Sequence, residues 1–232
     1  MLVQNPRRPF HSLTATLAVC AATAAGCATW TPFVDPRKAA QDQEAFGATA
    51  DQRITKLVAE AKAAQAAGPA GQAEFTQRLV TEMLGEHDPR VRCRILAVAA
   101  DFDTPAAVAI CKGALQDPDP DVRMEACTVW ARRGGPEAVS LLAARSTADD
   151  ELDVRLRALR MLGELRDDRA IPVLAKALED PDPAVQYRAV AALKRVSGRD
   201  LGDDVNKWRE WAADPEGSAA GWTIAEGFRR MF

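Results

Sequence analysis

Histidine, the commonest catalytic acid and base, occurs twice in this sequence of 232 residues. A Ser/His/Asp or Cys/His arrangement would have to use His11 or His87, the two histidines of the chain. We expect His11 to be removed with an N-terminal segment, and His87 stands alone before the turn at Asp88. The sequence therefore predicts a solvated loop histidine and a protein that is not an enzyme.

An acidic run from Asp117 to Asp121 could offer carboxylate oxygens to calcium. In a calcium loop that begins at Asp117, the sixth residue is glycine for the sharp turn and the twelfth is glutamate as a bidentate ligand. Those positions hold Val122 and Thr128. We expect a capped turn here and no metal.

Three cysteines, Cys93, Cys111 and Cys127, could bind zinc or form a redox pair. Their spacing matches neither kind of motif, and Cys127 takes an apolar position of the repeat described below. We expect them to be small buried side chains. Oxidation of one pair stays open as the alternative if the protein is exported.

Arginine recurs at one position of an internal repeat, and glutamine takes its place in the last copy. The residues are Arg92, Arg123, Arg155 and Gln186. Such a stripe could bind a ligand, or it could pair with acids of the same or the adjacent turn, such as Asp119 or Glu151. We favour the structural pairing.

Other basic and aromatic residues are candidates for binding a partner. Lys112, Arg145 and Lys176 lie in the second helix of successive repeats, which we expect to line a concave face. Near the C-terminus, Trp222 and Phe228 share one face of a short helical pattern with Ala225 and Phe232. This segment either docks back on the repeats or meets a partner or a lipid surface.

The charge balance argues against a nucleic-acid partner. The chain has 30 Lys and Arg against 33 Asp and Glu, a net charge of -3. Loss of residues 1–26, which contain Arg7 and Arg8, would shift the net charge from -3 to -5. The chain also lacks a run of five basic residues, so we expect no nucleic acid to bind.

A repeat of 31 or 32 residues positions these side chains. The apolar residues Val91, Val122, Val154 and Val185 come into register with spacings of 31, 32 and 31 residues. An acid stands three residues before each valine, and proline follows the acid in three copies, as at Asp88-Pro89. Acid followed by proline is typical of a helix start. We expect each acid to cap its helix, with a looser turn in the copy where Leu152 replaces proline.

Apolar residues recur four, five, eight and eleven positions after the valines, except that Arg133 takes the last of these positions in the second copy. This spacing indicates one face of an α-helix. A shorter apolar helix precedes the next copy, so each repeat is an antiparallel helix pair that buries its face against its neighbours. The sequence therefore predicts an all-α fold, a right-handed α-solenoid.

The run from Asp167 to Leu174 and the Asp-Pro-x-Val-Arg turns resemble HEAT repeats, and more narrowly the short bacterial repeats of phycobilin lyases. The resemblance covers about residues 72 to 200 and implies a fold but not an activity. The HEAT-repeat family includes metalloenzymes that bind iron through His-Glu pairs, and this chain has no such pair. The resemblance also implies, as an alternative function, a tetrapyrrole-handling module that acts like a lyase or a chaperone.

The first 26 residues have the pattern of a secretory signal peptide: two arginines, then the uncharged stretch Leu13 to Ala25. The segment ends in Ala24-Ala25-Gly26-Cys27, which resembles a lipobox and implies that Cys27 is lipidated. Cys20 as the lipidated residue and an ordinary signal cleaved near Ala28 are the alternatives. Alanine after the cysteine favours the outer membrane, facing the periplasm.

These patterns divide the chain into five parts. We expect a signal peptide at 1–26, a lipidated tether at 27–50, the repeats at 51–200, a capping helix at 201–213 and a tail at 214–232. Residues 51–85 form either a degenerate first repeat or an independent hairpin. Trp208 and Trp211 would close the far end of the stack or, alternatively, form a binding platform.

Taken together, the sequence predicts a scaffold anchored in the cell envelope that binds an unknown protein partner without catalysis, cofactor or metal. A tetrapyrrole-handling module and a purely structural envelope component are the alternatives.

Overall fold

The protein is described by a computed structural model, which places Lys38, Gln41, Ala45 and residues 47–215. Across these residues the secondary structure is helical, without any strand. Ala48 to Pro215 belong to one compact unit. None of the helices in this part of the chain combines the length and the apolar character needed to cross a membrane. The predicted signal peptide, Cys27, Trp222 and Phe228 lie outside the described residues.

The repeats are helix pairs, and we call their first members A helices and their second members B helices. The A helices are α2 (Ala50–Ala66), α4 (Pro89–Ala99), α6 (Pro120–Arg133), α8 (Leu152–Leu165) and α10 (Pro183–Ser197). The B helices are α3 (Gly68–Gly85), α5 (Pro105–Gly113), α7 (Gly135–Ala148) and α9 (Ile171–Ala177). The short 3-10 turns η1 (Ala114–Gln116) and η2 (Asp168–Ala170) adjoin α5 and α9, and α11 (Val205–Ala213) ends the described chain.

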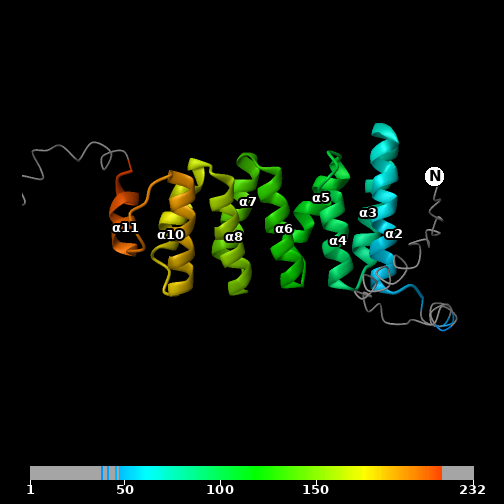
Figure 1. Cartoon of the computed structure of the whole chain (residues 1–232), viewed down its shortest axis with the longest axis horizontal. Helices are drawn as coiled ribbons and strands as arrows, with labels where there is room; N and C mark the ends of the chain where they lie inside the picture. The colour runs from blue at the N-terminus through cyan, green and yellow to red at the C-terminus, as the bar shows by residue number, and fades with distance from the viewer. Residues whose placement is uncertain (1–37, 39–40, 42–44, 46, 216–232) are drawn as a thin grey trace, which may run out of the picture. The chain divides into compact units, whose positions relative to one another are not determined.

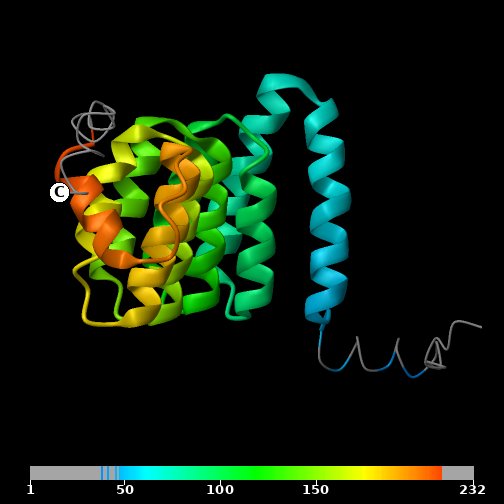
Figure 2. The same ribbon diagram turned by 60° about the vertical axis from the view of Figure 1, so that its left-hand side comes forward.

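The A helices stack in chain order, each against the next, from α2 to α10 (Figure 1). The B helices lie along one side of this row, and α2 and α11 stand at its two ends (Figures 1 and 2). The first pair follows the same plan, because α2 packs on α4 and α3 packs on α5. This is the arrangement of a first repeat, and it confirms the predicted all-α solenoid.

The recurring valines lie inside the stack, as predicted. Val91, Val122, Val154 and Val185 are at most 4% exposed. The residues five positions later, Leu96, Cys127, Leu159 and Val190, are also buried, so successive A helices share one apolar interior. Burial of each valine contributes about 1.5–3 kcal/mol to folding.

Aspartate caps three of the repeat helices. The carboxylates of Asp88, Asp119 and Asp182 accept the N–H of the residue two positions later, at 2.8–2.9 Å. Glu151 makes no such bond, so the expectation that all four acids cap their helices is wrong for this one. Its side chain is one methylene longer than that of aspartate, which fits the N-cap geometry poorly.

This difference gives a testable prediction. We expect Glu151→Asp to supply the missing cap and to raise the free energy of unfolding by about 0.5–1 kcal/mol. Urea unfolding monitored by circular dichroism measures it, with Glu151→Ala as the control that removes the carboxylate without adding a cap. Equal stability of the aspartate and alanine variants would show that an N-cap carboxylate at position 151 does not stabilise α8.

The last described helix, α11, closes the far end of the stack. Trp208 is fully buried, Trp211 is 5% exposed, and their rings meet edge to face at 5.5 Å. The Trp208 Nε1–H donates to the Gly202 carbonyl at 2.9 Å. Because both indoles are packed inside, they act as a cap on the apolar interior and not as an exposed platform.

Candidate functional site

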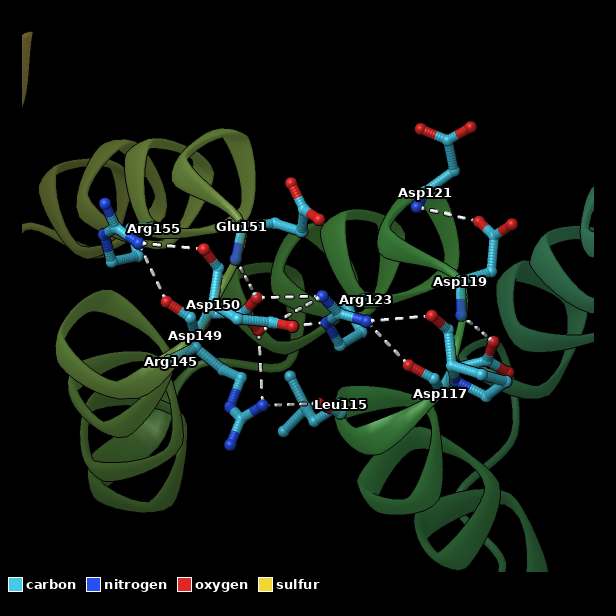
Figure 3. Close-up of polar contacts among 11 residues, drawn as sticks. Leu115, Asp117, Asp119, Asp121, Arg123, Arg145, Asp149, Asp150, Glu151 and Arg155 are labelled. Atoms are coloured by element: carbon cyan, nitrogen blue, oxygen red, sulfur yellow. Dashed lines mark hydrogen bonds and ion pairs between the residues drawn. The ribbon is translucent and has the colours of Figure 1, made fainter.

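Two of the arginines that recur in the repeats, Arg92 and Arg123, bridge neighbouring turns. Arg92 binds both carboxylate oxygens of Asp117, at 2.9 and 2.8 Å. Arg123 binds Asp149 in the same way, at 3.0 and 2.9 Å (Figure 3). The Nη1 of each guanidinium also donates to backbone carbonyls of its own turn, at 2.9–3.2 Å. Each arginine thus ties its own turn to the next one.

The predicted pairing with acids is confirmed for Arg92 and Arg123, but the predicted partner acids, Asp119 and Glu151, are wrong. Arg155 donates to the backbone carbonyls of Asp149 and Asp150 in its own turn. The true partners lie two residues before the cap position, where each carboxylate also accepts the cap residue's N–H, at 2.9 Å for Asp117 and 3.1 Å for Asp149. An acid stands five residues before every recurring valine, a signal that the sequence analysis overlooked. These acids are Glu86, Asp117, Asp149 and Asp180.

Asp149 is the centre of the network (Figure 3). Its side chain is fully buried, that of Arg123 is 9% exposed, and Arg145 approaches the same carboxylate at 3.3 Å. Burial raises the pKa of Asp149, but the hydrogen bonds from Arg123 and from the Glu151 N–H outweigh burial and hold the pKa below its usual value. The carboxylate therefore stays ionised, with its charge compensated inside the protein.

The lowered pKa of Asp149 predicts acid sensitivity with a definite sign. A carboxyl group whose pKa is lower in the folded state stabilises the protein above its unfolded pKa of about 3.9 and loses that contribution as the pH falls further. We expect the free energy of unfolding of the wild type to fall below about pH 4, and to fall less steeply in Asp149→Asn. Urea unfolding between pH 3 and pH 7 measures both curves, and parallel curves would contradict the assignment.

The three basic residues proposed for the concave face lie in different environments. Arg145 is held in the network, because its Nη1 donates to the Leu115 carbonyl at 3.1 Å and to Asp149. Lys112 pairs with Glu137 at 2.7 Å, which joins α5 to α7 at a half-exposed site. Lys176 is exposed, and the structure gives it no ion pair among the residues that it describes.

A groove opens between α3 and α5, which the sequence analysis did not anticipate. It encloses about 470 Å³, and its walls include the apolar residues Val80, Met83, Leu84, Ala109 and Ile110. Leu84 is a large apolar residue, yet it is 84% exposed. It lies nine residues after the buried Phe75, which is half a helical revolution away, so the 3.6-residue period could have placed it outside.

The network of turns forms one end of this groove. Arg92 and Asp117, which make the ion pair described above, contribute to its lining together with Glu86 and His87. A second groove of about 350 Å³ lies between α7 and α9 and is lined by Lys176 and by short side chains of Ala143, Ala144 and Thr147. Both grooves belong to the B helices.

The remaining reactive side chains are one histidine and three cysteines. His87 is exposed, and its backbone carbonyl accepts a hydrogen bond from Arg92 at 2.9 Å. Cys93, Cys111 and Cys127 are free thiols; Cys111 and Cys127 are fully buried and Cys93 is partly buried. In the described part of the chain, no three His, Cys, Asp or Glu residues are grouped so that they could hold a metal ion.

These thiols should be unreactive in the folded protein. Burial raises the pKa of Cys93 to about 11 and that of Cys127 to about 12, and it also raises the pKa of Cys111. Because the thiolate is the nucleophile, we expect iodoacetamide at pH 8 to alkylate these three only after urea unfolding. Peptide mass spectrometry gives the extent of labelling at each position, and rapid labelling of native Cys127 would contradict its burial.

Comparison with known proteins agrees with this geometry. A family model described as "HEAT repeats" matches residues 76–155 and 146–219, which is more than half of the chain. The chain belongs to the HEAT-repeat family. The two matches together span the helices from α3 to α11. The groove between α3 and α5 lies within the first match.

This HEAT-repeat protein is similar to two deoxyhypusine hydroxylases, one by sequence and one by structure. Deoxyhypusine hydroxylase of Mus musculus is 32% identical over 84 residues, which are 35% of this chain and 26% of that protein. The structure of human deoxyhypusine hydroxylase in complex with glycerol aligns with a TM-score of 0.47 and 21% identity, covering 53% of this chain and 44% of the human protein. This chain thus spans less than half of either relative.

Proposed function

We propose that this HEAT-repeat protein is a non-catalytic scaffold of the cell envelope whose B-helix face binds a protein partner. One observation carries the proposal: Leu84 is 84% exposed at the edge of a largely apolar groove between α3 and α5. A leucine left in water forfeits about 1.5–3 kcal/mol that its burial by a partner would recover.

The groove is built before any partner arrives, which supports its use for binding. Its lining residues Arg92 and Asp117 are joined by two hydrogen bonds and are about one-tenth exposed, so the turn at its end is fixed. A preformed site avoids the entropy loss of ordering a loop when the partner binds. The groove therefore suits an apolar side chain of the partner as an anchor.

Charge adds a second contact on the same face. Lys176 is exposed beside the short side chains of Ala144 and Thr147, which leave room for a partner to approach its ammonium group. Lys112 is half exposed but already shared with Glu137. We therefore propose a partner that presents an apolar anchor to α3 and α5 and an acidic group to Lys176.

The test compares two charge insertions. Leu84→Glu should abolish capture of the partner from solubilised membranes, because the bound partner would cover a carboxylate in the groove wall and strip it of its hydration. Val58→Glu is the matched control, since Val58 is a 45% exposed apolar residue on the A helix α2. Capture that survives Leu84→Glu, or that is lost equally in both variants, would remove the groove from the proposal.

We further propose that the scaffold is anchored through a lipid on Cys27. The support is the lipobox-like sequence before that cysteine and the signal-like segment of residues 1–26. We expect the mature N-terminus to carry a diacylglyceryl group by mass spectrometry, and Cys27→Ser to release the protein from membranes. An unmodified N-terminus near Ala28 would contradict the lipid anchor and would indicate an ordinary secretory signal peptide.

Other activities are weaker proposals. The hydroxylase activity of the two relatives does not transfer readily, because the aligned stretch covers 26% of the mouse protein and is explained by shared repeats. A tetrapyrrole-handling role is tested by absorbance after incubation with haem or a bilin. The scaffold proposal expects an unchanged spectrum, and a shifted Soret band that Leu84→Glu abolishes would favour the tetrapyrrole role.

A further inference from the structure

Arginines gather on the outer face of α8 and α10, away from the shared interior. They occupy the third, sixth and tenth positions after the recurring valines, which point outward when the valines point inward. On these two helices the positions hold Arg157, Arg160, Arg188 and Arg195, with Glu164 as the acid among them. Positive charge therefore exceeds negative charge on this face.

One carboxylate oxygen serves two of these arginines. Arg195 Nη1 lies 3.0 Å from Glu164 Oε1, and Arg160 Nε lies 3.6 Å from the same oxygen. The three side chains are 44–50% exposed. Because Glu164 shares its single negative charge between Arg160 and Arg195, it has no charge left to compensate a third guanidinium group.

Arg188 is that third guanidinium. At the same repeat position one helix earlier, Arg157 reaches back to the Thr128 hydroxyl on α6, at 3.4 Å. For Arg188 the position equivalent to Thr128 is Arg160, so the register offers it another cation in place of a hydroxyl acceptor. Among the described residues Arg188 has no hydrogen bond or ion pair, and its Nε is buried without a partner.

The helices that carry these arginines approach each other closely. Gly163 of α8 faces Ala192 of α10 so closely that a Cβ on Gly163 would lie 2.8 Å from the Ala192 Cα. The backbones of α8 and α10 are therefore closely packed along the stretch that carries the arginines. The surplus charge therefore stays concentrated on one small surface.

We propose that Arg160, Arg188 and Arg195 bind a phosphate group. Planar guanidinium forks match the oxygens of phosphate, and a dianion would compensate the charge that Glu164 cannot. The phosphate belongs either to a soluble phosphate ester or to a phospholipid headgroup. This site lies on the A helices and is independent of the partner-binding groove on the B helices.

The test titrates the full-length protein with inorganic phosphate by calorimetry, and separately measures sedimentation with phosphatidylcholine vesicles with and without phosphatidylglycerol. Arg188→Gln should weaken binding about tenfold, since it removes a charged hydrogen-bond donor. Arg94→Gln is the matched control, because Arg94 is exposed at the same repeat position on α4 and should change the affinity less than about twofold. Sodium chloride at equal ionic strength controls for screening.

The outcomes separate the sources of the phosphate. Binding of inorganic phosphate that depends on Arg188 supports a soluble ester, and binding confined to phosphatidylglycerol vesicles that depends on Arg188 supports a lipid headgroup. No binding of either probe, or equal binding by Arg188→Gln and the wild type, overturns the site. In phosphate-free buffer Arg188→Gln should be at least as stable as the wild type, and a lower melting temperature would contradict the crowding argument.

Discussion

Replacing Asp149 by alanine is expected to lower the free energy of unfolding by about 3–5 kcal/mol, a large part of the stability of a domain. The variant leaves the guanidinium of Arg123, which is 9% exposed, without its two hydrogen bonds to the buried carboxylate, so that the exposed Asp150 is its remaining ion-pair partner. It also removes the acceptor of the Glu151 N–H and a partner of Arg145. Urea unfolding monitored by circular dichroism gives the change.

The neighbouring residue Asp150 is the matched control. It binds the same guanidinium at 3.0 Å but is 87% exposed, so solvent screens the pair. We expect Asp150→Ala to change the stability by less than about 1 kcal/mol. The double variant Arg123→Met/Asp149→Leu should be less damaging than Asp149→Ala, because it leaves no buried charge. Equal effects of Asp149→Ala and Asp150→Ala would contradict a buried ion pair.

Gly163→Ala is expected to destabilise the protein by about 1–3 kcal/mol, although alanine is the better helix former by about 1 kcal/mol. The added Cβ would lie 2.8 Å from the Ala192 Cα, so the backbones of α8 and α10 would have to move apart. Gly163→Leu should be more damaging still. Thermal and urea unfolding both measure the change.

Gly113 is the control for helix propensity. It lies in α5 with no atom within 4 Å of the position of an added Cβ. We therefore expect Gly113→Ala to raise the stability by up to about 1 kcal/mol, opposite in sign to Gly163→Ala. If both variants stabilise the protein, the close approach of α8 and α10 is not a constraint.

The period of the repeat was enough to predict the helix pairs and their interior. Val91 and Val122 are buried as expected because an apolar face of 3.6-residue period must pack against a neighbour. The aspartate caps were predicted for a similar reason, since an N-cap depends on residues adjacent in the sequence. Local chemistry and periodicity thus account for the fold.

Contacts between repeats were harder to predict. Arg123 pairs with Asp149, 26 residues away, and sequence distance gives no means of choosing it over the nearer Asp119. Gly163 resembles any helical glycine until Ala192 is seen against it. In each case the deciding partner comes from another helix pair.

In the candidate site, too, the helix that carries each residue could be predicted, but the contacts of its side chain could not. Lys112 and Lys176 were assigned to the B helices, where the structure places them, but the sequence did not reveal that Glu137 pairs with one of them. The exposure of Leu84 runs against the general rule that a leucine in a helix is usually buried. Its exposure follows from its place near the end of α3, half a helical revolution away from the buried Phe75.

The most direct test of the binding face is site-specific photo-cross-linking in cells. Benzoylphenylalanine at position 84 places the reactive group at the groove on the B helices, and the same residue in place of Tyr187, which is 63% exposed on α10, places it on the A helices. The scaffold account predicts a discrete protein adduct from position 84 and none from position 187. An adduct from position 187 alone would contradict it.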